Sequence, residues 1–279
     1  MLMFNDNKNN TYVQPSSIAY HKWERVHEYS TQPGKSFTLN KVQEAIILAL
    51  NSMMLATVEM LTKYLNDLSM LEYSVNKELV MRETEVLYKD MYIKKYDFID
   101  VNNKHSEDII FSLGFRGKGW LGTNQEKPYM TGFIAQNNII TFKKILAANQ
   151  VLLACDMYKE FPCSLCKMIA DSEDDFANYA FRSHALVHRD DSVLILEVIR
   201  GEENYIDKAI RKLDRIYNTL NDVKSYNFEK MDLLYVTESE EQMVELIRAI
   251  NNKRQEGIKL WFTFDSLIVD DHNNRLYTI

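Results

Sequence analysis

Residues 193–217, VLILEVIRGEENYIDKAIRKLDRIY, predict a buried strand that leads into a charged helix. The apolar run at the start of this stretch contains a single carboxylate, Glu197, and it ends at Arg200-Gly201. Beyond that break, apolar residues recur at helical spacing among charged ones: Ile206, Ile210, Leu213 and Tyr217. A strand that ends in Glu-x-x-Arg-Gly before a helix is typical of the core of a nuclease-like domain.

The residues around this stretch extend it into a longer alternation of helices and strands. Helices are expected over 142–158, 203–222 and 240–252, and strands over 179–188, 192–199, 232–236 and 258–264. The resulting α-β-β-α-β-α-β order predicts a three-layer α/β domain with a mixed sheet, which we assign to residues 141–279.

The first half of the chain predicts three helices followed by a two-stranded hairpin. One helix starts after Thr38, and Thr57 and Ser69 are N-cap candidates for two more, the third reaching about Lys89. Strands are expected over 91–98 and 109–113. This order is the plan of a winged helix-turn-helix over residues 36–122, with a small α+β unit that has no nucleic-acid role as the alternative. The fold class is therefore α/β overall.

Three connecting segments lack a sustained period. Residues 1–35 are polar and predict a loose arm with a short helix around Ala19 to Tyr29, and residues 123–140 predict a linker. The segment 114–122, GFRGKGWLG, holds four of the eight glycines in the chain. Its glycine spacing is not a dinucleotide-binding fingerprint. We expect these glycines to turn the chain sharply out of the wing.

Composition limits the classes of function. The chain has 279 residues, 46% of them hydrophobic and 26% charged, as in a folded globular protein. A net charge of −7 excludes a protein held to DNA by bulk electrostatics. No apolar run approaches the roughly 18–20 residues needed to cross a bilayer, and the first residues lack the pattern of a signal peptide. The expected location is therefore cytoplasmic, without a membrane partner.

The three cysteines do not predict a disulfide framework, because their number is odd and no secretory signal is present. Cys163 and Cys166 have the spacing of a metal or redox pair, but a structural zinc site needs four ligands. Cys155, His184 and His188 are the remaining candidates, and nothing in the sequence brings them together. We therefore predict reduced thiols, no metal and no cofactor, and leave the role of the pair open.

Two sets of residues resemble the replication-relaxation family of Gram-positive plasmids and integrative elements. The first is the exit from the wing, FSLGFRGKGWL at 111–121, and the second combines FRSHA at 181–185 with LEVIRGEE at 196–203. The resemblance implies a winged helix joined to a restriction-endonuclease-like domain. It also implies a DNA-binding accessory protein in plasmid replication or conjugative DNA processing. The partners implied are double-stranded DNA and a relaxase or replication proteins. A homodimer is a further expected partner arrangement.

The second motif departs from the family pattern where catalysis would need it. Arg182, Glu197 and Arg200 match, but His184 stands in place of an aspartate and Ile199 in place of a second acid. Magnesium in a nuclease is held by several acidic oxygens, which this set does not supply. We therefore predict a vestigial site and no enzyme activity.

Two expectations follow for the vestigial site. Because a buried carboxylate needs a partner, Glu197 is expected to pair with Arg182 or Arg200. The alternative is an active metal-dependent endonuclease or nickase whose lysine comes from the following helix, as Lys208 or Lys212.

The candidate DNA-binding residues lie in and around the predicted winged helix. On the third helix they are Tyr73, Asn76, Lys77, Arg82 and Lys89, on the wing Lys94, Lys95 and Lys104, and at its exit Arg116 and Lys118. Acidic and basic residues nearly balance in this region, which predicts weak non-specific affinity and readout by a few side chains. A transcriptional regulator or protein-interaction module that dimerises through the same winged helix is the further alternative.

Overall fold

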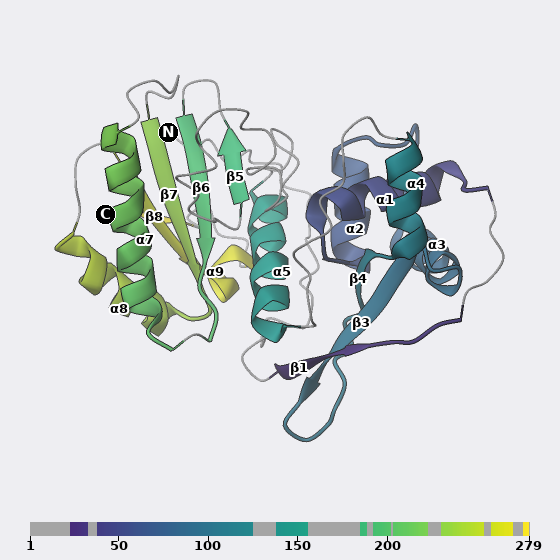
Figure 1. Ribbon diagram of the computed structural model, residues 1–279, viewed down its shortest axis with the longest axis horizontal. Coiled ribbons are helices and arrows are strands. Elements are labelled where there is room, and N and C mark those ends of the chain that lie inside the picture. Colours follow the sequence, from purple (N-terminus) through teal and green to yellow (C-terminus); the bar gives the residue numbers. More distant parts are fainter. Residues whose placement is uncertain are drawn as a thin grey trace. The chain divides into compact units, whose positions relative to one another are not determined.

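The chain folds into two compact units that divide between Leu153 and Ala154 in the computed structural model (Figure 1). The structure describes residues 23–32, 38–124, 138–155, 185–188, 192–201, 203–222, 230–253, 258–269 and 276–278. None of the helices in these ranges is both long enough and apolar enough to cross a membrane. Each unit contains its own sheet, so the protein is a mixed α/β protein.

The N-terminal unit begins its helical part with three short helices, each started by a side-chain cap. They are α1 (Lys41–Met53), α2 (Val58–Asp67) and α3 (Lys77–Lys89). The caps are Asn40, Thr57 and Asn76, whose side-chain oxygens each accept a hydrogen bond from a backbone N–H of the first turn. The three helices pack on one another around buried apolar residues such as Ile46, Leu61 and Val80.

The same unit contains a four-stranded antiparallel sheet. Its strands are β1 (Trp23–Glu28), β2 (Ala56–Thr57), β3 (Ile93–Asp100) and β4 (Ile110–Leu113), in the order β1-β3-β4-β2. Figure 1 shows β1 running beside β3, next to the loop that joins β3 to β4. We call β3, β4 and this loop the wing.

Two of the elements predicted for this unit are wrong, one in its type and one in its starting residue. The chain around Ala19 to Tyr29 was expected to be helical, but its described part forms β1, because it pairs with β3. The third helix was expected to start at Ser69 but starts at Lys77. Ser69 has a φ of 49°, whereas a residue in a right-handed helix has a negative φ, so no helix can begin with this residue in its first turn. The Asn66 side chain then bonds both backbone groups of Val75, at 2.8 and 2.9 Å, and holds the intervening turn.

The glycine-rich segment is a helix, α4 (Phe115–Asn124), and not the expected turn. Its glycines serve close packing against the backbone that enters β3. A Cβ atom on Gly117 would lie 2.2 Å from the Tyr92 carbonyl oxygen, and one on Gly114 would lie 2.4 Å from the Met91 carbonyl oxygen. Only glycine permits that approach.

The helix α5 (Ile139–Ala154) packs with the N-terminal unit, although the sequence assigned its residues to the second domain. Phe142 contacts the rings of Tyr96 and Phe98, at centroid distances of 5.1 and 6.5 Å. The buried Asn149 side chain donates hydrogen bonds to the carbonyl oxygens of Met53 and Leu55, at 2.8 and 2.7 Å. These contacts move the boundary between the units from residue 141 to Leu153.

The C-terminal unit is built on a mixed sheet, as the sequence predicts, and its described residues form five strands, of which the last was not expected. Its strands are β5 (Ala185–His188), β6 (Ser192–Val198), β7 (Lys230–Thr237), β8 (Ile258–Phe264) and β9 (Tyr277–Thr278), in that order. The central strands β6, β7 and β8 are parallel, and the two outer strands are antiparallel to their neighbours. The helices among the described residues of this unit are α7 (Tyr205–Asp222), α8 (Glu240–Asn251) and α9 (Asp265–Val269).

The core of this unit lies between the sheet and the helices α7 and α8. Ile195, Tyr235 and Phe262 from the strands form one buried cluster with Leu213 of α7 and Leu246 of α8. Figure 1 shows α7 crossing the sheet on this side. On β6 and β7 the strand residues that alternate with these, such as Leu194, Leu196, Leu234 and Val236, are also buried, as is usual for parallel strands covered on both faces. The described residues show one helical layer, so the three-layer arrangement stays a prediction.

Candidate functional site

The predicted DNA-binding residues all belong to the N-terminal unit, but they do not form one basic face. Lys77, Arg82 and Lys89 lie on α3 and are exposed. Asn76 caps that helix, and its side-chain oxygen accepts the Leu79 N–H at 2.9 Å, so it has a structural role already. Tyr73 lies before the helix, not on it, and is 54% exposed.

Carboxylates neutralise several of these basic side chains. Lys77 pairs with Glu59, whose hydrogen bond raises the pKa of Lys77. Arg82 contacts Glu83 at 3.0 Å, although its own side chain remains 70% exposed. This pairing agrees with the near-neutral charge balance of the unit and limits its attraction for a phosphate backbone.

The wing residues differ in how accessible they are. Lys95 is paired with Glu85 at 2.5 Å, and its side chain is only 18% exposed. Its ammonium group also lies 5.4 Å from the centre of the Tyr29 ring. Lys94 pairs with Glu28 at 2.8 Å, whereas Lys104 is exposed in the loop. Among the three wing lysines, Lys104 therefore presents its charge most openly to a partner.

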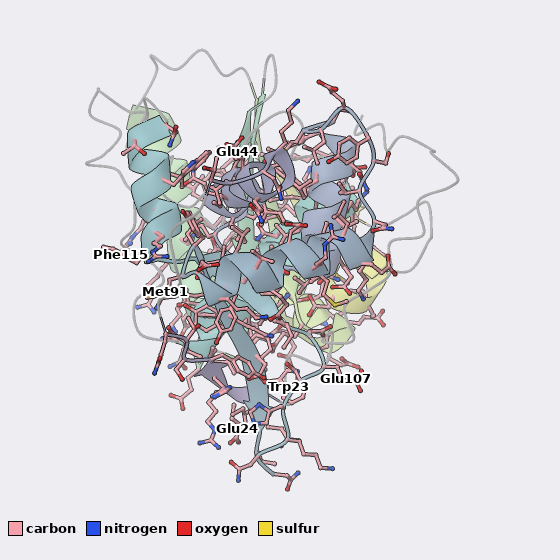
Figure 2. All side chains as sticks on the ribbon, turned by 90° about the vertical axis from the view of Figure 1, so that its right-hand side faces the viewer. Trp23, Glu24, Glu44, Met91, Glu107 and Phe115 are labelled. Carbon is pink, nitrogen blue, oxygen red and sulfur yellow. The ribbon has the colours of Figure 1, made fainter. Side chains whose placement is uncertain are left out.

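The basic residues of α4 lie close to the start of β3. Arg116 donates to the Asp90 carbonyl oxygen at 3.2 Å. Burial, followed by the nearby charge of Lys94, lowers the pKa of Lys118. The cations Lys94 and Lys118 thus share one small region. Glu107 belongs to the wing loop, and Glu24 lies near the start of β1 (Figure 2).

The carboxylate at the centre of the predicted vestigial site, Glu197, pairs with Lys212 of α7. The expected partner Arg200 is elsewhere, and Arg182 and His184 lie outside the described residues, as do Cys163 and Cys166. Both side chains of the observed pair are mostly buried, 12% exposed for Glu197 and 15% for Lys212. Glu197 is therefore held by an internal ion pair, as expected, but with a lysine as its partner.

Arg200 belongs to a second polar cluster, at the carboxyl ends of the three parallel strands. It follows β6, Glu238 follows β7, and Asp265 follows β8. Arg200 is fully buried and donates to Asp265 at 2.5 Å and to the Ile199 carbonyl oxygen at 2.7 Å. Burial raises the pKa of Asp265 to about 6, with Arg200 opposing the rise. The buried guanidinium of Arg200 is thus paired with the carboxyl group of Asp265.

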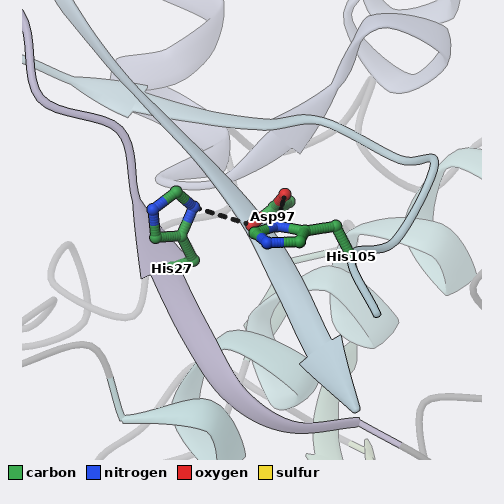
Figure 3. A group of neighbouring side chains, drawn as sticks. All are labelled: His27, Asp97 and His105. Carbon is green, nitrogen blue, oxygen red and sulfur yellow. Dashed lines mark hydrogen bonds and ion pairs between the residues drawn. The ribbon is translucent and has the colours of Figure 1, made fainter. Parts of the chain in front are cut away.

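A third polar cluster surrounds Asp97 on β3, and sequence reasoning missed it. His27 lies opposite Asp97 on β1, and its Nδ1 is 3.2 Å from one carboxylate oxygen. His105, from the wing loop, places its Nδ1 2.6 Å from the other oxygen (Figure 3). Tyr29 donates its hydroxyl to that second oxygen at 2.7 Å. The cluster depends on the pairing of β1 with β3, which the polar sequence of the arm did not indicate.

Comparisons with protein-family models, with curated proteins and with solved structures found no match to this chain.

Proposed function

We propose that the protein binds double-stranded DNA through its N-terminal unit, which acts as a winged helix-turn-helix. The observation that carries this proposal is the order of elements α1-β2-α2-α3-β3-β4, with β4 paired between β2 and β3. Three helices followed by a hairpin whose sheet includes a short strand after the first helix is the arrangement of that DNA-binding fold. We further propose a non-catalytic accessory role at a plasmid replication or transfer origin, which rests on the family resemblance.

The two elements would contact DNA differently. In helix-turn-helix proteins the second helix of the motif enters the major groove, with residues near its N-terminus facing the bases. Here that helix is α3, which exposes Lys77 and Arg82 in its first two turns. The exposed Lys104 in the wing loop is placed to contact phosphate, which fixes orientation without reading sequence.

The ion pairs on α3 favour sequence-specific binding of DNA over non-specific binding. Lys77 is paired with Glu59 and Arg82 with Glu83, so a contact of either side chain with DNA competes with an existing ion pair. Non-specific binding gains little from such exchanges, because each phosphate contact by Lys77 or Arg82 replaces an existing ion pair. Readout of a few bases by a bidentate arginine retains about 1–3 kcal/mol of discrimination for each good contact.

The test is the affinity of the full-length chain for duplex DNA, measured by fluorescence anisotropy. Replacing Lys77 and Arg82 together by alanine is expected to weaken binding to DNA flanking its own gene by roughly 10-fold or more. Lys104→Ala is expected to weaken binding to all duplexes and to reduce the salt slope by about one. Lys253→Ala, on an exposed lysine of the C-terminal unit, is the matched control and should leave affinity unchanged. Failure to bind any duplex at low salt would reject the proposal.

A second candidate function is metal-dependent cleavage of DNA by the C-terminal unit. The contact between Glu197 and Lys212 favours it, because an acid and a lysine side by side are two of the groups that such a nuclease uses. Two acidic oxygens from one carboxylate hold a magnesium ion less well than a set of carboxylates would. This makes the non-catalytic proposal the better supported of the two.

Incubation of supercoiled plasmid with the protein and Mg²⁺ or Mn²⁺ separates these functions. We expect no conversion to nicked or linear DNA, for the chain as it stands or for Glu197→Ala. Nicking by the unaltered chain that disappears in both Glu197→Ala and Lys212→Ala would establish the nuclease instead.

A further inference from the structure

The cluster around Asp97 combines two imidazole rings with one carboxylate, a set of donors that matches particular metal ions. Nitrogen ligands from histidine suit zinc and the neighbouring transition metals, whereas magnesium and calcium prefer oxygen ligands only. We propose that His27, Asp97 and His105 bind a divalent transition-metal ion of the zinc class. This inference is independent of the proposed DNA-binding function.

The positions of the donor atoms fit such an ion. One ligand atom from each of the three residues lies within 4.8 Å of the other two. Zinc bonds to nitrogen and oxygen are about 2.0–2.2 Å long, which places the ligands of a tetrahedral site roughly 3.4 Å apart. His27 Nδ1 and Asp97 Oδ1, at 3.2 Å, already have that separation.

The site is open to solvent on the side of its two histidines, so an ion bound there can exchange with the solvent. The histidine side chains are 39% exposed for His27 and 48% for His105, whereas the Asp97 side chain is fully buried. The ion would therefore enter from the histidine side and take a water molecule as its fourth ligand, as in zinc sites with three protein ligands.

The carboxylate is oriented before any ion arrives. The Tyr29 hydroxyl donates to Asp97 Oδ2 at 2.7 Å. Hydrogen bonds of this kind to a ligating carboxylate are a usual feature of metal sites, because they fix the ligand. A buried carboxylate is also costly unless its charge is compensated. A divalent cation compensates the charge of Asp97 more fully than neutral donors can.

The wing loop holds His105 in place through its own hydrogen bonds. Asp100 Oδ1 accepts from the backbone N–H groups of Asn102 and Lys104, at 2.8 and 2.9 Å. The Ser106 N–H donates to the Phe98 carbonyl oxygen at 2.7 Å, and its hydroxyl accepts the Phe98 N–H at 3.0 Å. The residues on both sides of His105 are thus fixed, which favours a preformed ligand.

The experiment is a zinc chloride titration of the full-length chain after removal of metal with a chelator, followed by calorimetry. We expect one zinc ion per chain, with binding weakened at least 10-fold by His27→Gln/His105→Gln. Cys163→Ser/Cys166→Ser is the matched control, because these cysteines are the other candidate ligands, and it should leave binding unchanged. Cobalt(II) should give the visible absorption of a four-coordinate site without a thiolate charge-transfer band.

Thermal unfolding supplies a second readout. Zinc at about 100 times its Kd should raise the Tm of the unaltered chain by roughly 5–10 °C, and should not raise that of His27→Gln/His105→Gln. If that variant does not fold, Asp97→Asn provides the same comparison with a side chain of the same shape. The proposal is overturned if the unaltered chain binds no zinc, or if the histidine variants bind it equally well. It is also overturned if binding is lost in the cysteine variant.

Discussion

Replacing Asp265 by alanine is expected to lower the free energy of unfolding of the C-terminal unit by about 3–5 kcal/mol. The reason is that Arg200, which is fully buried, loses its carboxylate partner and keeps its charge. Folded domains are typically stable by only about 5–15 kcal/mol. The single change would therefore remove a large part of the stability of this unit.

Urea denaturation followed by tryptophan fluorescence measures this loss. Trp261 on β8 reports on the C-terminal unit once Trp23 and Trp120 of the other unit are replaced by phenylalanine. The control is Arg200→Met/Asp265→Leu, which removes both charges. It should recover most of the stability, because burial of two apolar side chains carries no cost for the desolvation of a charge. A stability of Asp265→Ala within 1 kcal/mol of the unaltered chain would show that the pair does not have this role.

Replacing Gly117 by alanine should destabilise the N-terminal unit by about 3 kcal/mol, at the upper end of the usual cost of overpacking. The added Cβ atom would lie 2.2 Å from the Tyr92 carbonyl oxygen, far inside contact distance. That oxygen cannot easily move, because it accepts the Gly114 N–H at 2.8 Å. The helix α4 would have to shift away from β3 instead.

Gly119 offers a matched control on the same helix. An added Cβ atom there meets nothing within 4 Å, so Gly119→Ala should stabilise α4 by roughly 0.5–1 kcal/mol through helix propensity. Thermal unfolding monitored by the fluorescence of Trp120, which lies on α4, would compare the two variants. Changes of the same sign in both would show that close approach to Tyr92 does not explain the glycine at 117.

The sequence predicted helices and strands well where the spacing of apolar residues agrees with the burial of those residues in the fold. The stretch from Val193 to Tyr217 forms the expected strand and helix, β6 and α7, and Ile195 of the strand shares one buried cluster with Leu213 and Tyr217 of the helix. The alternation of predicted helices and strands in the second half of the chain likewise predicted the mixed sheet. The partner of Glu197 could not be found in this way, since the position of Lys212 depends on how α7 crosses the sheet.

Predictions failed where distant backbone determines local structure. The glycines at 114 and 117 suggested a turn, but they permit a helix to approach the backbone of residues 91 and 92. The sequence did not predict the strand β1, because its polar side chains show no apolar alternation. The segment is a strand because its backbone pairs with that of β3. The charged cluster of Arg200, Glu238 and Asp265 arises from three strand ends that are far apart in the sequence.

The pairing of β1 with β3 also bears on how the chain avoids association. Without β1, the outer edge of β3 would expose unpaired backbone groups, which readily recruit strands of other molecules. The covering strand itself carries Glu24, Arg25 and Glu28, and such charges discourage edge-to-edge contact. A shortened chain that began at residue 36 would lose this protection and uncover Asp97. We therefore expect a fragment of the N-terminal unit that lacks Trp23–Glu28 to associate more readily than one that includes this strand.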